Sequence, residues 1–114
     1  MIVAVDFDGT LHTGTYPSIG AAAPYAADVI AQLRRDGHYV ILWTCRYGSE
    51  LTDALNWLLE RGIVFDRIND NHPENTQLYG HTRKVFADVY VDDHQIGGLP
   101  TWKEIYNHIK NLSK

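Results

Sequence analysis

An apolar run at the start of the chain ends in two carboxylates that are separated by a single residue. The segment Ile2-Val3-Ala4-Val5 is followed directly by Asp6-Phe7-Asp8. A short continuous apolar run is typical of a central strand buried on both faces of a parallel sheet. Residues i and i+2 of a strand share a face, so Asp6 and Asp8 are expected to point toward one place where the strand ends.

Two carboxylates held this close repel one another unless a cation or a shared proton resolves the repulsion. The pair therefore predicts an Mg²⁺ site that also carries out chemistry. The alternative is a plain turn, because Asp-Gly is a common turn dipeptide. A turn explains Asp8 and Gly9, but it leaves Asp6, next to the apolar run, without a role.

The composition is that of one ordinary globular domain. The chain has 114 residues, 45% hydrophobic and 21% charged, so a single domain over residues 1–114 is expected. The net charge of -4 argues against a broad nucleic-acid-binding surface. The chain has one cysteine, and neither a secretory signal nor a membrane-spanning run is recognisable. These features favour a cytoplasmic protein without membrane contact.

Strand and helix patterns alternate along the chain. After the first strand comes a flap rich in Gly, Thr and Ser (residues 11–20). The patterns then predict a helix over about 22–35, a strand over 39–43, a helix capped by Ser49 and ended by Gly62, a weaker strand over 63–68, a strand over 85–91, and a last helix with the capping box Thr101-x-x-Glu104. Residues 69–83 form a long polar loop with room for a short helical turn. The alternation predicts an α/β fold of three layers, α/β/α, around a mainly parallel, Rossmann-like sheet.

Three of the apolar strands end in polar side chains, at Asp6, at Thr44 and at the pair Asp92-Asp93. Ligands of open parallel sheets bind outside the carboxyl ends of the strands. Because those ends lie along one edge of the sheet, these residues and Asp8 are expected to face one another although they are far apart in sequence.

The same positions resemble, in order, the four motifs of the haloacid dehalogenase superfamily, whose members are mostly Mg²⁺-dependent phosphatases that act through an aspartyl-phosphate. Residues 6–11 (DFDGTL) resemble motif I, and residues 41–44 (ILWT) resemble motif II. Lys84 stands where the motif III lysine is expected, and residues 89–93 (VYVDD) resemble motif IV. No segment is long enough for the cap domain that many members carry, so the resemblance implies a capless member with an open site.

The resemblance implies catalytic roles for four residues. Asp6 is the expected nucleophile, which forms the covalent intermediate. Asp8 is expected to protonate the leaving oxygen and then to activate water. Thr44 would donate a hydrogen bond to a phosphoryl oxygen, and Lys84 would offset the charge on the nucleophile and the transferring group.

Metal and substrate contacts follow from the same resemblance. Mg²⁺ prefers oxygen ligands and usually keeps several waters. Its expected ligands are Asp6, the backbone carbonyl of Asp8 and the Asp92-Asp93 pair, of which Asp93 is favoured as the direct ligand and Asp92 as acting through water. The predicted substrate contacts are Gly9, Thr10 and Arg46. Arg46 can fork onto a substrate anion, but pairing with a carboxylate is an equal alternative.

Cys45 and the histidines are expected to have no catalytic part. Cys45 adjoins Arg46, without the phosphate-cradling loop that a cysteine phosphatase needs, so it is interpreted as a packing residue. The histidines show no zinc-ligand spacing and are expected mainly on the surface, with His72 and His94 in loops near the site.

The sequence therefore predicts a Mg²⁺-dependent phosphatase that hydrolyses a phosphorylated substrate through an aspartyl-phosphate on Asp6. Three alternatives stay open: a phosphotransferase or nucleotidase with the same intermediate, a receiver-type signalling module, and a non-catalytic binding protein with this fold. A receiver is disfavoured because its phospho-acceptor follows a middle strand, whereas Asp6 follows the first. A site without a cap admits large substrates or calls for a neighbouring subunit, which leaves room for a homo-oligomer.

Overall fold

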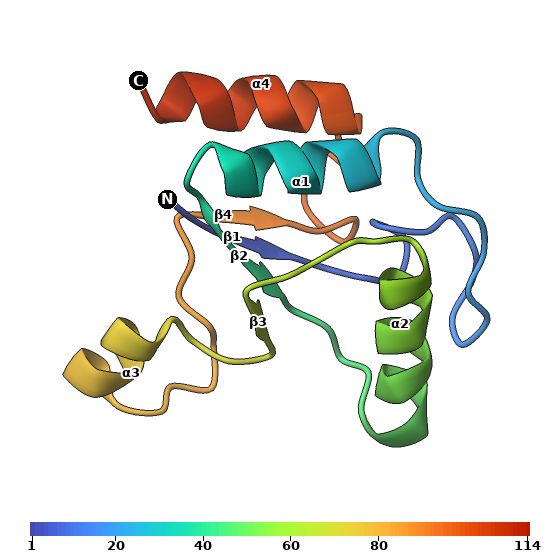
Figure 1. Cartoon of the computed structure of the whole chain (residues 1–114), viewed down its shortest axis with the longest axis horizontal. Coiled ribbons are helices and arrows are strands. Elements are labelled where there is room, and N and C mark those ends of the chain that lie inside the picture. The colour runs from blue at the N-terminus through green and yellow to red at the C-terminus, as the bar shows by residue number, and fades with distance from the viewer.

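The computed structural model describes residues 1–114 as alternating strands and helices. Figure 1 shows the course of the chain from the N-terminal strand to the C-terminal helix. The elements are β1 (Ile2–Val5), α1 (Ala26–Arg35), β2 (Tyr39–Leu42), α2 (Gly48–Glu60), β3 (Arg67–Ile68), α3 (Pro73–Tyr79), β4 (Val89–Val91) and α4 (Trp102–Leu112). None of these helices combines the length and the apolarity needed to cross a lipid bilayer.

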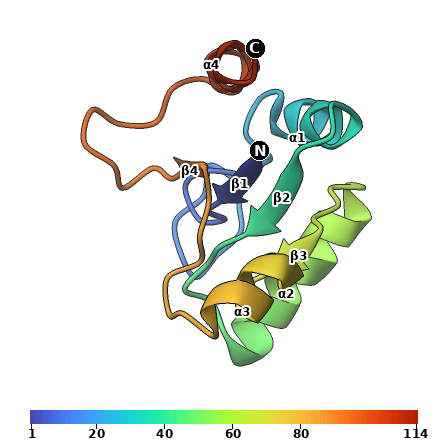
Figure 2. The same cartoon turned by 90° about the vertical axis from the view of Figure 1, so that its left-hand side faces the viewer.

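The four strands form one sheet in the order β3-β2-β1-β4, and every pair is parallel. Helices α1, α2 and α4 place buried side chains in one core cluster with Val3, Val5 and Val40, so they cover the same face of the sheet. Helix α3 lies on the opposite side (Figures 1 and 2). Val3 and Val5 on one face and the paired Ala4 and Ile41 on the other are all buried, as expected of strands covered on both faces. The predicted α/β architecture with a parallel sheet is confirmed, and its arrangement is compatible with a Rossmann-like fold of three layers.

The winding of the chain changes direction at β1. From β1 the chain proceeds to β2 and then β3 on one side, and it returns to β4 on the other side. The backbone N–H of Asp6 donates to the carbonyl of Val91 at 2.9 Å, so the two strand ends are directly joined. Such a switch point is where ligands of open α/β sheets bind, and Asp6 and Asp92 lie on either side of it.

Two helix starts differ from the sequence prediction. Helix α1 begins at Ala26 rather than near residue 22, because the preceding residues pair with the flap: Ala23 N–H donates to Leu11 O at 2.8 Å. Ser49 lies inside α2, whose N-cap is Tyr47. The capping box at the start of α4 is confirmed.

Two strands are shorter than predicted because side chains make backbone hydrogen bonds that a longer strand pairing would use. Before β3, the carboxylate of Asp66 accepts from Val40 N–H at 2.8 Å. Before β4, Phe86 N–H donates to the side-chain oxygen of Asn71 at 2.8 Å, and Ala87 N–H donates to the Tyr90 hydroxyl at 3.1 Å. The polar loop contains α3 as its helical turn.

Candidate functional site

Three carboxylates converge at the carboxyl ends of β1 and β4. One oxygen from each of Asp6, Asp92 and Asp93 lies within 4.8 Å of the other two. The buried hydroxyl of Thr10 lies 3.4 Å from an oxygen of Asp6 and 3.4 Å from an oxygen of Asp93, and it accepts from Asp93 N–H at 3.2 Å. Thr10, expected to touch substrate, therefore holds the two carboxylates in place.

The acidic cluster makes ionisation of Asp6 unfavourable. Burial, a hydrogen bond with Asp93 and the charge of Asp92 raise the pKa of Asp6 from 3.8 to about 8. Three carboxyl groups supply the hard oxygen donors that Mg²⁺ prefers, and a divalent cation among them would reverse the repulsion. The donor set therefore fits the ion that the sequence predicts.

Gly9 allows Asp93 to reach this cluster. Its φ of +77° is strained for any residue with a side chain, and a Cβ at this position would lie 2.2 Å from Asp93 Oδ2 and 2.8 Å from its Cγ. Gly9 lines the cleft, but its contact with Asp93 explains why no side chain fits here.

Gly9→Ala is expected to weaken Mg²⁺ binding at least about 10-fold, because the added methyl group displaces the Asp93 carboxylate. The matched control is Gly62→Ala. Gly62 has a similar φ of +67° and open space around its Cβ position, so this variant should lose only about 1 kcal/mol of stability. Isothermal titration of both variants with Mg²⁺ measures the effect, and equal affinities would refute the steric argument.

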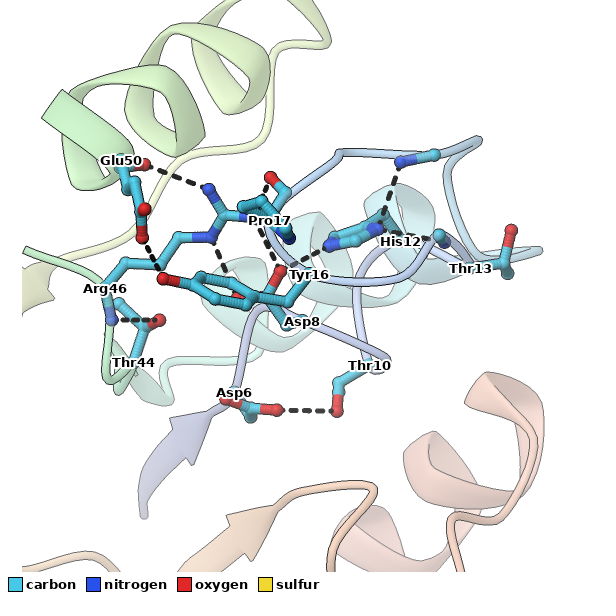
Figure 3. Close-up of polar contacts among 12 residues, drawn as sticks. Asp6, Asp8, Thr10, His12, Thr13, Tyr16, Pro17, Thr44, Arg46 and Glu50 are labelled. Atoms are coloured by element: carbon cyan, nitrogen blue, oxygen red, sulfur yellow. Dashed lines mark hydrogen bonds and ion pairs between the residues drawn. The ribbon is translucent and has the colours of Figure 1, made fainter.

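The side chain of Asp8 is held by the guanidinium of Arg46 and the imidazole of His12 on the flap side of the cleft. Arg46 bonds both of its oxygens, Nε to Oδ2 at 2.8 Å and Nη2 to Oδ1 at 2.7 Å, and His12 Nε2 lies 2.8 Å from Oδ1 (Figure 3). Partial burial opposes ionisation, but the hydrogen bonds from Arg46 and His12 outweigh it and lower the pKa of Asp8. Asp8 is therefore a carboxylate in this arrangement.

Arg46 links three parts of the chain. It is only 3% exposed, and besides Asp8 it donates to the carbonyl of Pro17 at 2.9 Å and to that of Glu50 at 3.2 Å. Its guanidinium carbon lies 5.2 Å from the centre of the Phe7 ring and 5.1 Å from that of Tyr16. Most of its donors are used within the protein, so Arg46 pairs with a carboxylate, the second of the two roles considered for it.

His12 is a buried residue that sequence reasoning placed on the surface. It is 0% exposed, and its Nδ1 accepts from Gly14 N–H at 3.0 Å and from Gly20 N–H at 3.2 Å. Its one signal in the sequence was its position four residues after Asp8. That spacing acquires meaning only when the path of the flap is known.

A cleft of about 570 Å³ collects most of the predicted site residues together with the tip of the flap. Thr44 lies in its wall, where its hydroxyl accepts from Arg46 N–H at 3.2 Å and its own N–H donates to the side chain of Asn69 at 2.8 Å. Cys45 is exposed in this cleft rather than packed in the core, and His94 lines it as well. The lining residues are Asp6, Asp8, Gly9, Gly14, Thr15, Tyr16, Thr44, Cys45, Arg46, Asp92, Asp93 and His94.

The structure does not bring Lys84 into this cleft. Its ammonium lies 4.9 Å from the centre of the Tyr90 ring, beside a separate cavity of about 710 Å³ between α3 and the segment before β4. His72, expected near the site, instead caps α3 by accepting from Glu74 N–H at 3.1 Å. Motif order along the chain therefore did not give the position of the lysine in space.

Comparison with known proteins gives one informative relative. A solved structure described as the "conserved protein coded by locus from Bacteroides thetaiotaomicron" is 40% identical to this chain, with a TM-score of 0.88 over 97% of this chain and 90% of that one. This chain belongs to the same family as that protein. No protein-family model matches the sequence, and the search of curated proteins finds no match. No activity is stated in the words that describe the Bacteroides relative. The relationship therefore supports the fold, and the chemistry is inferred from the geometry of the site.

Proposed function

We propose that this protein is a capless, Mg²⁺-dependent phosphatase of the haloacid dehalogenase type. The observation that carries the proposal is the convergence of Asp6, Asp92 and Asp93 within 4.8 Å at the switch point of a parallel sheet. Asp6 adjoins the open cleft and is joined to β4, so a phosphate in the cleft can approach it.

The residues proposed to hold Mg²⁺ are Asp6, Asp93 and the backbone carbonyl of Asp8, with Asp92 acting through water. Asp93 is favoured over Asp92 because it is the one that Thr10 and Gly9 contact. When bound, the ion supplies positive charge that lets an anionic carboxylate and an anionic phosphate come together.

The proposed reaction has two steps. An oxygen of Asp6 attacks phosphorus, the bond to the leaving oxygen breaks, and an aspartyl-phosphate forms. Water then attacks the same phosphorus, Asp8 accepts a proton from that water, and the bond to Asp6 breaks to release inorganic phosphate. The Thr44 hydroxyl, in the wall of the cleft, is proposed to donate to a phosphoryl oxygen.

Asp8 is better suited to the second step than to the first. The hydrogen bonds from Arg46 and His12 that lower its pKa favour the carboxylate, which is the form that accepts a proton. Substrates whose leaving group departs without a proton, such as aryl phosphates, are therefore expected to react faster than alkyl phosphates.

The test is release of inorganic phosphate from p-nitrophenyl phosphate by the purified protein. We expect turnover with Mg²⁺ and its loss with excess EDTA, and alkyl phosphates should be slower. Assays with added alcohols separate hydrolysis from transfer, because a phosphotransferase gives a new phosphate ester. A protein that binds Mg²⁺ but releases no phosphate from either substrate class would be the non-catalytic alternative.

A further inference from the structure

We propose that His12 is a positioning residue with two separate tasks, each assigned to one nitrogen of its ring. Nε2 holds the Asp8 carboxylate, and Nδ1 holds the two ends of the flap tip, residues 14–20. The inference rests on the proposed function for its kinetic consequence only, since both tasks can be measured without an activity.

The hydrogen bonds fix which nitrogen carries the proton. Nδ1 accepts from two backbone donors, Gly14 N–H and Gly20 N–H, at 3.0 and 3.2 Å. A backbone N–H can only donate, so Nδ1 carries no hydrogen and the hydrogen of the neutral ring lies on Nε2. Nε2 lies 2.8 Å from Asp8 Oδ1 and therefore donates to it.

The ring is held in one orientation by the core below it. Its centre lies 4.9 Å from that of the Phe7 ring and 6.1 Å from that of Trp57, and the side chain has no exposed surface. A buried ring with three hydrogen bonds cannot turn over without leaving polar groups unpaired. His12 is therefore a rigid link between the core, Asp8 and the flap.

The flap, which His12 contacts through Nδ1, is a narrow hairpin. Thr13 N–H donates to Ala21 O at 2.9 Å, and the backbones of Gly14 and Gly20 lie so close that a Cβ on either would meet the other at 2.5 Å. The tip that this neck closes carries Tyr16, which lines the cleft beside Arg46. The flap is thus a preformed wall of the cleft, and His12 fixes it at its base.

The hydrogen bonds from His12 and Arg46 determine which oxygen of Asp8 can still accept a hydrogen bond. Oδ1 accepts from both His12 Nε2 and Arg46 Nη2, whereas Oδ2 accepts from Arg46 Nε alone. The remaining acceptor capacity of this carboxylate therefore lies on Oδ2. His12 and Arg46 together present one defined oxygen to a water or leaving group in the cleft, which is the kind of preorganisation that raises kcat.

Two substitutions separate the two tasks. In His12→Asn, the amide oxygen can take the place of Nδ1 and accept from the glycine N–H groups, but no donor reaches Asp8. In His12→Gln, the amide nitrogen can take the place of Nε2 and donate to Asp8, but the glycine N–H groups lose their acceptor. The matched controls are the same two substitutions at His81, which is exposed and has no hydrogen bond.

The first readout is nuclear magnetic resonance of the ¹⁵N-labelled protein and needs no substrate. In the wild type, we expect a ring hydrogen on Nε2 and none on Nδ1, and slow hydrogen exchange at the Gly14 and Gly20 amides. His12→Asn should retain that slow exchange, and His12→Gln should lose it. A hydrogen on Nδ1, or fast exchange at both amides in the wild type, would overturn the inference.

The second readout is phosphatase kinetics. His12→Asn should lower kcat about 10- to 100-fold with little change in KM, and His12→Gln should raise KM with a smaller effect on kcat. Wild-type kcat and KM in both variants would overturn the catalytic consequence. If the wild type itself releases no phosphate, the proposed function fails while the resonance readout still decides the structural roles.

A third variant covers the case in which substitution of the buried ring unfolds the protein. Gly20→Ala leaves His12 intact but forces the neck of the flap apart, because the new methyl group would meet Gly14 N at 2.5 Å. It should reproduce the faster exchange at Gly14 and the higher KM of His12→Gln. A Gly20→Ala protein with wild-type exchange and KM would show that the neck does not shape the cleft.

Discussion

Asp6→Asn should lower kcat for p-nitrophenyl phosphate by at least about 10⁴-fold, because an amide does not replace a carboxylate as the attacking nucleophile. The fold should survive, since asparagine has nearly the same shape and its side chain removes a negative charge from a crowded acidic cluster. The measurements are steady-state kinetics at saturating Mg²⁺ and the circular dichroism spectrum of the same preparation.

The control is Asp53→Asn on the exposed face of α2, which removes the same charge outside the cleft and should leave kcat unchanged. Mass spectrometry of the wild type quenched during turnover should find the phosphoryl group on Asp6. Wild-type activity in Asp6→Asn, or a phosphoryl group on another residue, would remove Asp6 from the role of nucleophile.

Stability in the absence of metal should fall as pH rises from about 4 to about 8. The pKa of Asp6 is about 8 in the folded protein and 3.8 in its unperturbed state, so between these values the folded chain keeps a proton that the unfolded chain releases. Unfolding then releases a proton, and the free energy of unfolding decreases with pH across this window. Below this pH window, Asp6 is protonated in both the folded and the unfolded state, and its stabilising contribution to the fold is fully present.

Mg²⁺ should reverse this loss, because its proposed ligands are the ionised carboxylates of the cluster. At a free concentration 100 times Kd, a ligand of the folded state adds about 2.7 kcal/mol, which on a domain of this size raises Tm by roughly 10 °C. The gain should be larger at pH 8 than at pH 5, where the proton competes with the ion.

Urea unfolding of the wild type and of Asp6→Asn at both pH values, with EDTA or with Mg²⁺, measures these effects. Subtracting the pH profile of one protein's unfolding free energy from that of the other removes the contribution of groups that titrate in both. With EDTA, the free energy of unfolding of Asp6→Asn should increase relative to that of the wild type as pH rises. Addition of Mg²⁺ should stabilise Asp6→Asn less than it stabilises the wild type. Parallel pH profiles with no effect of Mg²⁺ would contradict the presence of a cation site at Asp6.

Much of this architecture could be predicted from local patterns. The apolar run before Asp6 has the composition of a strand covered on both faces, and Thr101 and Glu104 form the capping box that starts α4. These features depend on residues close together in the chain, which is why periodicity and capping rules detect them. The alternation of strands with helices then predicts a parallel sheet.

Strand ends were less predictable, because they depend on distant side chains. Asn71 takes the N–H of Phe86, and the Tyr90 hydroxyl takes that of Ala87, so residues that look like strand do not join the sheet. Composition alone cannot distinguish a backbone group bonded to a neighbouring strand from one bonded to a side chain.

The sequence by itself determined the parallel α/β fold and the gathering of Asp6, Asp92 and Asp93 at one edge, because topology brings the carboxyl ends of parallel strands together. Only the tertiary structure decided what surrounds them. It directed Arg46 and His12 onto Asp8 and kept Lys84 beside Tyr90. The physical reason is that the strand order places strand ends, whereas the path of each loop decides which long side chains reach them.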